Sequence, residues 1–265
     1  NVYKREFPSK KEALFILVFT FAFFIMAEII IMSIFSSRVE VFLSEAIIII
    51  PSLFFIYKRG YSFKKSFRLI GINKKTVLAS IITAVALIVI SDELDRIVKM
   101  IFPVPPQFTG LEEQLNKSLQ FKSVYDFFII FVSAVGMAAV FEEMLFRGLI
   151  QKALENEMDI TRAVVFTAFF FAFIHIWPWS VIQILILGIF LGFMAWKSDS
   201  IWPAVIVHGL VNSVSLTVNN ISVETPGWYL WKGHVSPVFV GMAIYLLIKG
   251  IKLFYKIYQP QEIET

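Results

Sequence analysis

The stretch that decides the fold reads VGMAAVFEEMLFRG and runs from Val135 to Gly148. It places three charged residues, Glu142, Glu143 and Arg147, in a run that is otherwise apolar and continues to Ile150. A charged side chain at bilayer depth costs about 2.5–3.5 kcal/mol on insertion scales, so it needs a partner or a function. We therefore interpret the stretch as a membrane-spanning helix that carries a functional site. The alternative is a helix end lying in the lipid headgroups.

The composition of the whole chain agrees with a membrane protein. Of its 265 residues, 58% are hydrophobic and 17% are charged, whereas a soluble domain carries about a quarter charged residues. The formal net charge of +4 fits basic cytoplasmic loops, so we expect no nucleic-acid partner. The sequence contains no cysteine, which excludes disulfides, a thiolate nucleophile and Cys-ligated zinc.

Eight apolar stretches are long enough, or nearly long enough, to cross a bilayer, which takes about 20 residues. They are residues 13–35, 40–57, 76–99, 124–150, 161–179, 181–197, 201–219 and 235–256. The first lacks a small-residue cleavage site, so we expect a retained helix. No repeat or long linker divides the chain, which predicts one membrane domain over residues 1–265. The predicted fold is an all-α, polytopic transmembrane helix bundle of about eight spans.

The basic residues predict the orientation of this bundle. They cluster before the first span, in the loop after the second and near the end of the chain: Lys4, Arg5, Lys10 and Lys11; Lys58, Arg59, Lys64, Lys65, Arg68, Lys74 and Lys75; Lys249, Lys252 and Lys256. With eight spans, all three sets fall on one side, which the positive-inside rule makes cytoplasmic. Both termini are therefore predicted to be cytoplasmic. The third loop, with Asp92, Glu93, Asp95, Glu112 and Glu113, is predicted to lie outside.

Spacing separates the roles of the two neighbouring glutamates. Glu143 and Arg147 are four residues apart, so they share a helical face and are expected to pair. Glu142 is rotated about a quarter turn away and is free to point elsewhere. Gly136, Ala138 and Ala139 allow another helix to approach just before Glu142.

Two further pairs repeat the four-residue spacing. Phe171 and His175 lie in the fifth span, and His208 and Asn212 lie in the seventh. A lone histidine such as His175 is often a structural hydrogen-bonding residue, and His208 with Asn212 is also explained by interhelical hydrogen bonding, which His and Asn supply in membranes. Two of the three histidines nevertheless fall in apolar helices that lack other ionisable groups, which favours a shared function. The third, His234, is expected near the interface beside Trp228 and Trp231.

Depth in the membrane restricts how these residues can meet. If the fourth span ended at Arg147, Glu142 would lie near the cytoplasmic surface, whereas His175 lies about 20 Å into the fifth span. We therefore predict that the helix of Glu142 continues well past Arg147, or that the fifth helix is tilted or starts late. Glu142, His175, His208 and Asn212 must converge inside the bilayer if they form one site.

These residue types suit the hydrolysis of a carbonyl compound by water. A carboxylate among apolar side chains can act as a general base near neutral pH, and a neighbouring histidine can share the proton. A second histidine with an asparagine can donate hydrogen bonds to a developing oxyanion. Motifs of other intramembrane hydrolases (GxSxG, GxGD and HExxH) are absent from the sequence. Glu142, His175 and His208 could also ligate zinc, but the short two-ligand spacing of zinc sites is missing, so no metal or cofactor is expected.

Three motifs in order carry a specific resemblance: Glu142-Glu143-x-x-x-Arg147, Phe171-x-x-x-His175 and His208-x-x-x-Asn212. Together they resemble the CPBP family, the CAAX-protease and bacteriocin-processing intramembrane glutamic endopeptidases that include the eukaryotic Ras-converting enzyme. The resemblance covers roughly residues 124–216, which would form the catalytic core. Phe146-Arg147-Gly148 and the residues 200–204 before His208 are similar to the prokaryotic branch.

The resemblance implies roles for the individual residues. Glu142 would activate water with help from His175, while His208 and Asn212 would stabilise the oxyanion. Glu143 and Arg147 would support the site, and Phe171 would line the substrate cavity. The implied substrate is a prenylated or otherwise hydrophobic peptide, from whose CAAX-type C-terminus three residues are removed. The implied location is a prokaryotic cell membrane, in contact with lipid, with the active site open to the cytoplasm.

Other functions remain open at the level of sequence. A scaffold or bacteriocin-immunity protein of the same fold would keep the helices without using the site. A zinc-dependent protease would use Glu142 and the histidines as ligands. A proton-coupled transporter could use a Glu/His relay, although it explains the Glu143–Arg147 pair less well.

Overall fold

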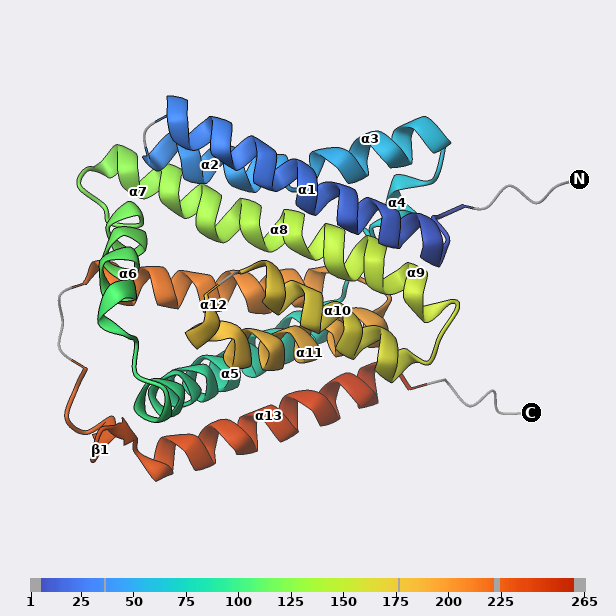
Figure 1. The fold of residues 1–265 in the computed structure, drawn as a ribbon. Coiled ribbons are helices and arrows are strands. Elements are labelled where there is room, and N and C mark those ends of the chain that lie inside the picture. The colour runs from blue at the N-terminus through green and yellow to red at the C-terminus, as the bar shows by residue number, and fades with distance from the viewer. Residues whose placement is uncertain (1–5, 36, 176, 222–224, 260–265) are drawn as a thin grey trace, which may run out of the picture.

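The structure is a computed structural model and describes residues 6–35, 37–175, 177–221 and 225–259, so that Lys4 and Arg5 lie outside it. Its elements are α1 (Lys10–Ile34), α2 (Ser37–Ile47), α3 (Ile50–Arg59), α4 (Phe63–Ser66), α5 (Lys74–Ile101), α6 (Pro106–Ser118), α7 (Val124–Phe131), η1 (Val132–Met137), α8 (Ala138–Glu143), η2 (Met144–Gln151), α9 (Lys152–Glu155), α10 (Ile160–Ile174), η3 (Pro178–Ser180), α11 (Val181–Ser198), α12 (Trp202–Asn220), β1 (Leu230–Trp231), β2 (His234–Val235) and α13 (Pro237–Ile257). They form a helical bundle (Figure 1).

The polytopic helical bundle predicted from the sequence is confirmed. Six stretches in the described part of the chain are long and apolar enough to cross a membrane: Lys10–Ile34, Arg38–Arg59, Lys74–Ile101, Val124–Glu155, Pro178–Ser198 and Pro237–Ile257. Helices α10 and α12 occupy the other two predicted stretches but are not among the six. The short antiparallel pair β1–β2 is the one departure from all-α structure among the described residues.

The fifth predicted span, residues 161–179, was placed wrongly. Helix α10 has 15 residues and ends at Ile174, and His175 is its C-terminal cap. At 1.5 Å per residue it reaches about 22 Å, which is shorter than a hydrocarbon core of about 30 Å. Pro178 disfavours helical backbone at Trp177, which is extended, so the helix could not continue through this point to residue 179. The chain then turns back along α11, so His175 lies at the tip of a helical hairpin.

The helix of Glu142 runs well past Arg147, as the depth argument required. Residues Val124–Glu155 form one continuous stretch of 32 residues. Two of its segments, η1 and η2, have π-helical hydrogen bonding on either side of α8. Such segments are frequent at functional sites because they turn side chains away from the ordinary helical phase. Helix α8 lies between these two π-helical segments, and Glu142 and Glu143 are its last two residues.

Polar contacts tie the helix ends together at both ends of the bundle. At the end that carries both termini (Figure 1), Arg68 pairs with Glu155 and Asp199, which joins the loop after α4 to α9 and to the end of α11. At the opposite end, Arg38 of α2 pairs with Asp126 of α7. There the amide of Phe121 also donates to the side chain of Asn220 at the end of α12, over 2.6 Å.

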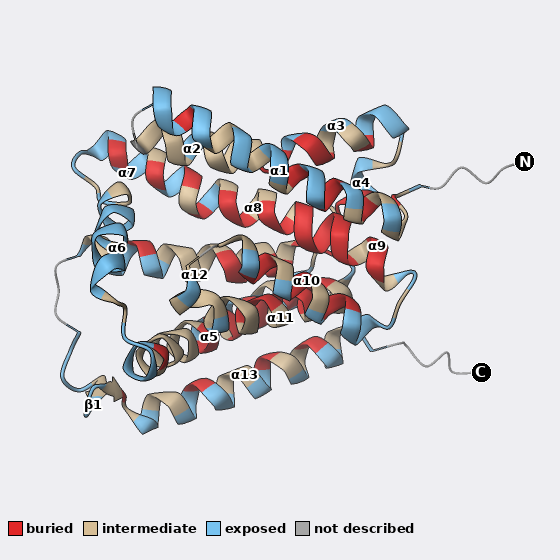
Figure 2. Ribbon diagram, viewed as in Figure 1, coloured by how far each residue is buried: buried red, intermediate tan, exposed pale blue. Residues whose placement is uncertain are grey.

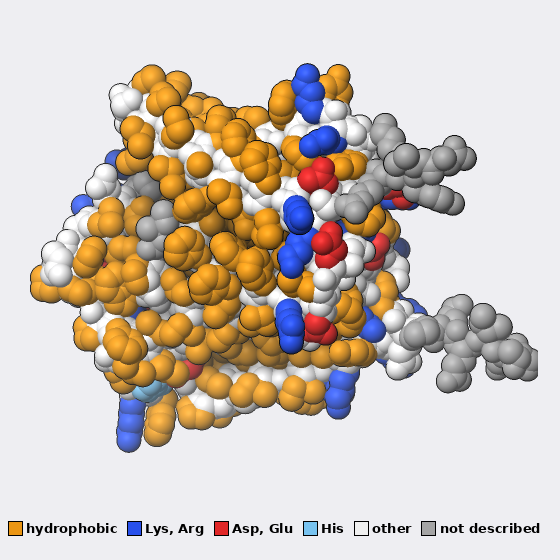
Figure 3. Space-filling view, turned by 45° about the vertical axis from the view of Figure 1, so that its right-hand side comes forward, with side chains coloured by type: hydrophobic (Ala, Val, Ile, Leu, Met, Phe, Trp, Pro, Cys, Tyr) orange, Lys and Arg blue, Asp and Glu red, His pale blue; other side chains and the backbone are white. Residues whose placement is uncertain are grey.

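Charge is distributed unevenly between these two ends. Figure 3 shows Lys and Arg side chains gathered near the termini, beside a broad hydrophobic surface of the kind that contacts lipid. We call the end with the termini the basic end. Among the described residues it carries fifteen Lys and Arg: Lys10, Lys11, Lys58, Arg59, Lys64, Lys65, Arg68, Lys74, Lys75, Lys152, Arg162, Lys197, Lys249, Lys252 and Lys256. The three predicted basic clusters, as far as they are described, therefore share one end.

Two apolar clusters flank the middle of the bundle. One joins α1 and α3 to η2, α9 and α10, with Ile16, Ile56 and Leu149 at its centre. The other joins α5, α11, α12 and α13 around Leu87 and Leu191. Figure 2 shows the buried residues concentrated along α8, α9 and α11, between these clusters. The polar residues predicted from the sequence lie in this zone.

A single glycine lets the loop after α4 press against the central helix. A Cβ added at Gly148 would come within 2.8 Å of the backbone of Phe67. No other residue fits there without moving the backbone, since Cβ contacts below 3.0 Å essentially do not occur. The contact places Phe67, which is fully buried, directly over η2.

Candidate active site

Glu143 and Arg147 form the buried ion pair that their spacing predicts. Arg147 Nη1 donates to Glu143 Oε1 over 2.9 Å, and both side chains are fully buried. Arg147 Nη2 also donates to the backbone carbonyl of Gly188 on α11, over 3.3 Å. A buried charge is tolerated when it is paired and hydrogen-bonded in this way. The pair thus fixes α11 against the central helix.

His208 bonds to this pair and not to Glu142. Its Nδ1 lies 2.9 Å from Glu143 Oε1. An ionised carboxylate only accepts hydrogen bonds, so the Nδ1–H of His208 donates. His208 is 3% exposed, and the bond fixes the orientation of its ring. Its Nε2 is the ring nitrogen that is left for the adjoining cavity.

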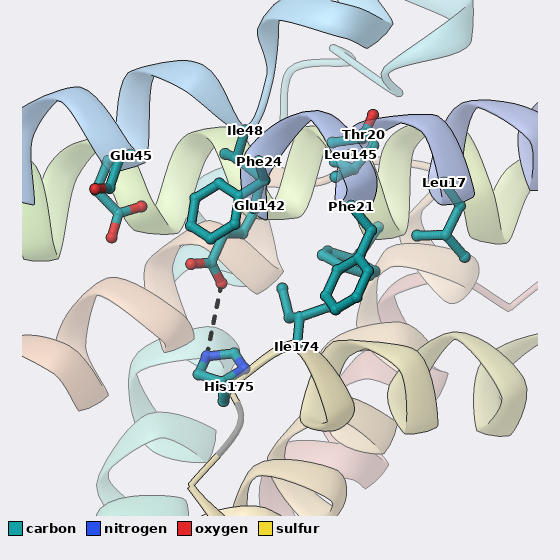
Figure 4. Close-up of a pocket in the computed structure, with 12 residues that line it drawn as sticks. Leu17, Thr20, Phe21, Phe24, Glu45, Ile48, Glu142, Leu145, Ile174 and His175 are labelled. Atoms are coloured by element: carbon teal, nitrogen blue, oxygen red, sulfur yellow. Dashed lines mark ion pairs between the residues drawn. The ribbon is translucent and has the colours of Figure 1, made fainter. Parts of the chain in front are cut away.

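Glu142 lies on the other side of the helix and faces His175. Figure 4 shows the two side chains pointing toward each other from α8 and from the tip of the α10–α11 hairpin. Glu142 Oε2 is 4.0 Å from His175 Nε2, and it has no hydrogen-bond partner among the described residues. His175 Nδ1 lies 2.7 Å from the backbone carbonyl of Phe171, so Nδ1 carries the proton. In a neutral ring, Nε2 is then the acceptor that faces Glu142.

Phe171 holds the two histidines apart. Its ring packs edge-on against His175 at 4.9 Å and against His208 at 5.7 Å between centroids. The guanidinium of Arg147 lies 4.0 Å from the centre of the same ring. Such a cation–π contact stabilises a desolvated arginine. Phe171 therefore connects the two halves of the site.

Asn212 is held by the π-helical segment η1. Its Nδ2 donates to the backbone carbonyl of Ala134 over 2.9 Å. One hydrogen of the amide group is used by this bond, and the second remains available. Asn212 lies one helical turn after His208 on α12, and both line the same cavity.

Two cavities meet at His175. The larger, of about 980 Å³, is lined by Phe171, His175, His208 and Asn212 together with residues of α5, α11 and the loop before β1. The smaller, of about 110 Å³, is lined by Glu142 and His175 together with residues of α1 and α2. Glu142 thus lies in the small cavity and the other three candidates in the large one. His175 is the residue that lines both.

Glu28 and Glu45 were missed by the sequence analysis. Glu45 of α2 lines the small cavity beside Glu142 (Figure 4), and Oε1 of Glu28 on α1 is buried without a hydrogen-bond partner among the described residues. Both residues lie within the predicted spans 13–35 and 40–57. A carboxylate inside an apolar run was the signal that could have found them.

One other expectation changes at the end of the bundle opposite the termini. Helix α5 continues to Ile101, so Asp92, Glu93 and Asp95 lie on a helix and not in a loop. His234 lies in β2 beside Trp231, as expected, and its Nδ1 is 2.8 Å from Glu93. Within the described ranges, no group of three or more His, Cys, Asp or Glu is arranged to hold a metal ion.

Comparison with known families gives the segment around this site a clear match. Residues 124–214 match the family model described as type II CAAX prenyl endopeptidase Rce1-like. This segment of 91 residues, about a third of the chain, is similar to the Rce1-like family. No curated protein and no solved structure matches it. The Rce1-like segment runs from α7 into α12 and contains every candidate residue from Glu142 to Asn212.

The family match supports, in the broad sense, a membrane protease of the CAAX type. The Rce1-like segment does not include α1, α2, α5 or α13. Of these helices, α2 supplies Glu45 to the small cavity, and α5 supplies Asp92, Asp95, Arg96 and Lys99 to the large one. The walls around the site therefore contain residues that the family match does not cover.

Proposed function

We propose that the protein is a glutamic intramembrane endopeptidase in which Glu142 activates the attacking water molecule. The observation that carries the proposal is the approach of the buried Glu142 to His175 Nε2, at 4.0 Å. One water molecule can hydrogen-bond to two acceptors at this separation. We place the catalytic core in residues 124–216, within a single membrane domain.

Glu142 and His175 act on the same water molecule in different ways. The carboxylate takes a proton from water, which then attacks the scissile carbonyl carbon. His175, with its Nδ1–H fixed by Phe171, accepts hydrogen bonds at Nε2 and orients the same water. The proton held by Glu142 passes to the leaving amine as the C–N bond breaks. Water is consumed, and a carboxylate and an amine are formed.

His208 and Asn212 are proposed as the oxyanion donors. Glu143 holds His208 through Nδ1, and Ala134 holds Asn212 through one amide hydrogen. Donors fixed in advance stabilise the negative charge of the tetrahedral intermediate without reorganising during the reaction. Glu143 and Arg147 have a supporting role, since they touch His208 and Phe171 and lie behind the cavity wall.

The family description names prenylated CAAX-type substrates, which are the first probes to use. Purified protein in detergent is incubated with a farnesylated CAAX peptide and with its unprenylated counterpart. Cleavage is expected for the wild type and is expected to be lost in Glu142→Gln. Glu113→Gln is the matched control, because Glu113 is exposed on α6, where it pairs with Lys117. Full activity of Glu142→Gln would overturn the assignment of the base.

The same assay separates the competing functions. A zinc protease would lose activity with a chelator and regain it with Zn²⁺. A scaffold or immunity protein would show no cleavage, and its cellular phenotype would be insensitive to substitution of Glu142, His175 and His208. The proposed location is a prokaryotic cell membrane.

A further inference from the structure

We infer that the large cavity receives its substrate from the extracytoplasmic side of the membrane, so that the substrate is a peptide segment exposed at that face. The inference rests on the proposed function for the identity of the reaction. Its direction rests on three separate features: where the cavity opens, what closes the other end, and how the charges are distributed.

The large cavity opens at the end of the bundle opposite the basic end. Its wall comes from the second half of α5, the start of α11, the second half of α12 and the loop before β1. In Figure 1 these segments lie away from the two termini. The wall runs from His208, which is 3% exposed, to Trp228, which is 72% exposed. A peptide entering at Trp228 can therefore reach the histidines.

The mouth of this cavity is polar. Arg96 pairs with Asp92 at 3.1 Å, and Lys99 pairs with Asp95 at 3.2 Å, all four lining the cavity. Tyr229 hydrogen-bonds to Asp92, and burial, together with the neighbouring carboxylate, raises the pKa of its hydroxyl. The four charged side chains are paired but still 25–41% exposed, and exposed charge is stable in water and costly in lipid, so the mouth is an aqueous entrance.

The basic end is closed by packed side chains. Arg68, 3% exposed, donates to the carbonyl of Arg147 over 3.2 Å and pairs with Glu155 and Asp199. Beside it, Gln151 is fully buried and donates to the carbonyl of Gly192 over 2.8 Å. With Phe67 pressed onto Gly148, these residues fill the space between α4, α9 and α11. A peptide at this end meets a packed wall.

The charges assign the two ends to the two sides of the membrane. The basic end has fifteen Lys and Arg, while the opposite end has six among the described residues: Arg38, Arg96, Lys99, Lys117, Lys122 and Lys232. The positive-inside rule places the basic end in the cytoplasm. Because the termini and the cavity mouth lie at opposite ends of the bundle, they cannot both face the cytoplasm. The bias of fifteen Lys and Arg against six favours cytoplasmic termini and a cavity that opens on the opposite side.

The direction of entry selects the substrate class in the cell. A prenylated C-terminus held in the cytoplasmic leaflet would meet the closed end. An exported or membrane-anchored polypeptide with its cleavable segment on the outer face would meet the open one. The hydrolytic chemistry is the same in both cases, so purified protein in detergent can cleave peptides that it does not meet in the cell.

Cysteine labelling tests the orientation without using activity. The natural chain has no cysteine, so each single substitution gives a unique label site. Thr225→Cys lies at the cavity mouth, Gly110→Cys lies on α6 at the same end with open space around it, and Asn156→Cys lies between α9 and α10 at the basic end. A membrane-impermeant maleimide is expected to label the first two in intact cells and the third only after permeabilisation. Labelling of Asn156→Cys alone in intact cells would overturn the inference.

Sealed right-side-out vesicles test the entry of substrate. A lysine-rich, membrane-impermeant peptide that the purified enzyme cleaves is added outside wild-type and Glu142→Gln vesicles. Cleavage by intact wild-type vesicles supports entry from the outer face, and cleavage only after permeabilisation overturns it. If no peptide is cleaved by the purified enzyme, the proposed function fails, while the labelling result still decides the orientation.

Discussion

His208 Nδ1 and Glu143 Oε1 are joined at 2.9 Å, so the buried histidine of α12 is held by the second glutamate of the central helix and not by the first. The same oxygen accepts from Arg147. Glu142, one residue earlier, faces His175 in a different cavity. Two chemically identical neighbours thus have different surroundings: Oε1 of Glu143 accepts from both His208 and Arg147, whereas Glu142 Oε2 faces His175 without a hydrogen-bond partner among the described residues.

Glu143→Ala is expected to destabilise the protein far more than Glu142→Ala. Removing Glu143 leaves Arg147 buried without its partner, and breaking a buried pair costs about 3–5 kcal/mol. The measurement is thermal unfolding of both variants in the same detergent. A similar Tm for both variants would contradict the structural role of Glu143.

His175→Ala is expected to lower kcat by roughly 10²–10⁴, the usual contribution of a general acid or base. Its Tm should remain near that of the wild type, because His175 is only part-buried at the end of α10. His234→Ala is the matched control: this histidine bonds to Glu93 and should leave kcat unchanged. Loss of folding in His175→Ala would show that the residue acts as a cap only.

Asn212→Ala is expected to lower kcat by about 10²–10³ with little change in KM, because an oxyanion donor acts mainly in the transition state. Steady-state kinetics with a cleaved peptide measures both constants. Asn156→Ala, at the basic end, serves as the control substitution. A rise in KM with unchanged kcat would assign Asn212 to substrate binding instead.

Gly148→Ala and Gly241→Ala are expected to change stability in opposite directions. At Gly148 the new methyl group meets the backbone of Phe67 at 2.8 Å, and overpacking costs about 1–3 kcal/mol. At Gly241 on α13 nothing lies within 4 Å, so alanine gains about 1 kcal/mol of helix propensity. Thermal unfolding of the two variants compares them directly, and a stabilised Gly148→Ala would contradict the close contact.

Arg68→Ala is expected to lower the Tm clearly, while Arg59→Ala should have little effect. Arg68 is buried and connects Glu155, Asp199 and the carbonyl of Arg147. Arg59 is exposed, with Glu12 at 3.8 Å, and such surface pairs contribute about 0–1 kcal/mol. Equal effects on the Tm would show that the packed basic end contributes no special stability.

Much of the fold could be predicted because its signals are local. Lengths of apolar sequence located the helices, and the four-residue spacing predicted the Glu143–Arg147 pair. Other features depend on contacts between distant segments. The early end of α10 at Ile174, the π-helical turns around α8 and the approach of Glu45 to Glu142 each needed the packing of neighbouring helices. The roles given to Glu142, His175, His208 and Asn212 stay predictions until activity is measured.

The sequence by itself determined a polytopic helical membrane protein, the phase that separates Glu142 from Glu143, and a basic end that contains both termini. These follow from hydrophobic length, helical periodicity and the count of Lys and Arg, which are properties of single segments. Only the tertiary structure decided that His208 binds Glu143, that His175 lies between two cavities, and that the large cavity opens away from the basic end. Each of these depends on which side chains fill the space between helices, and no single segment contains that information.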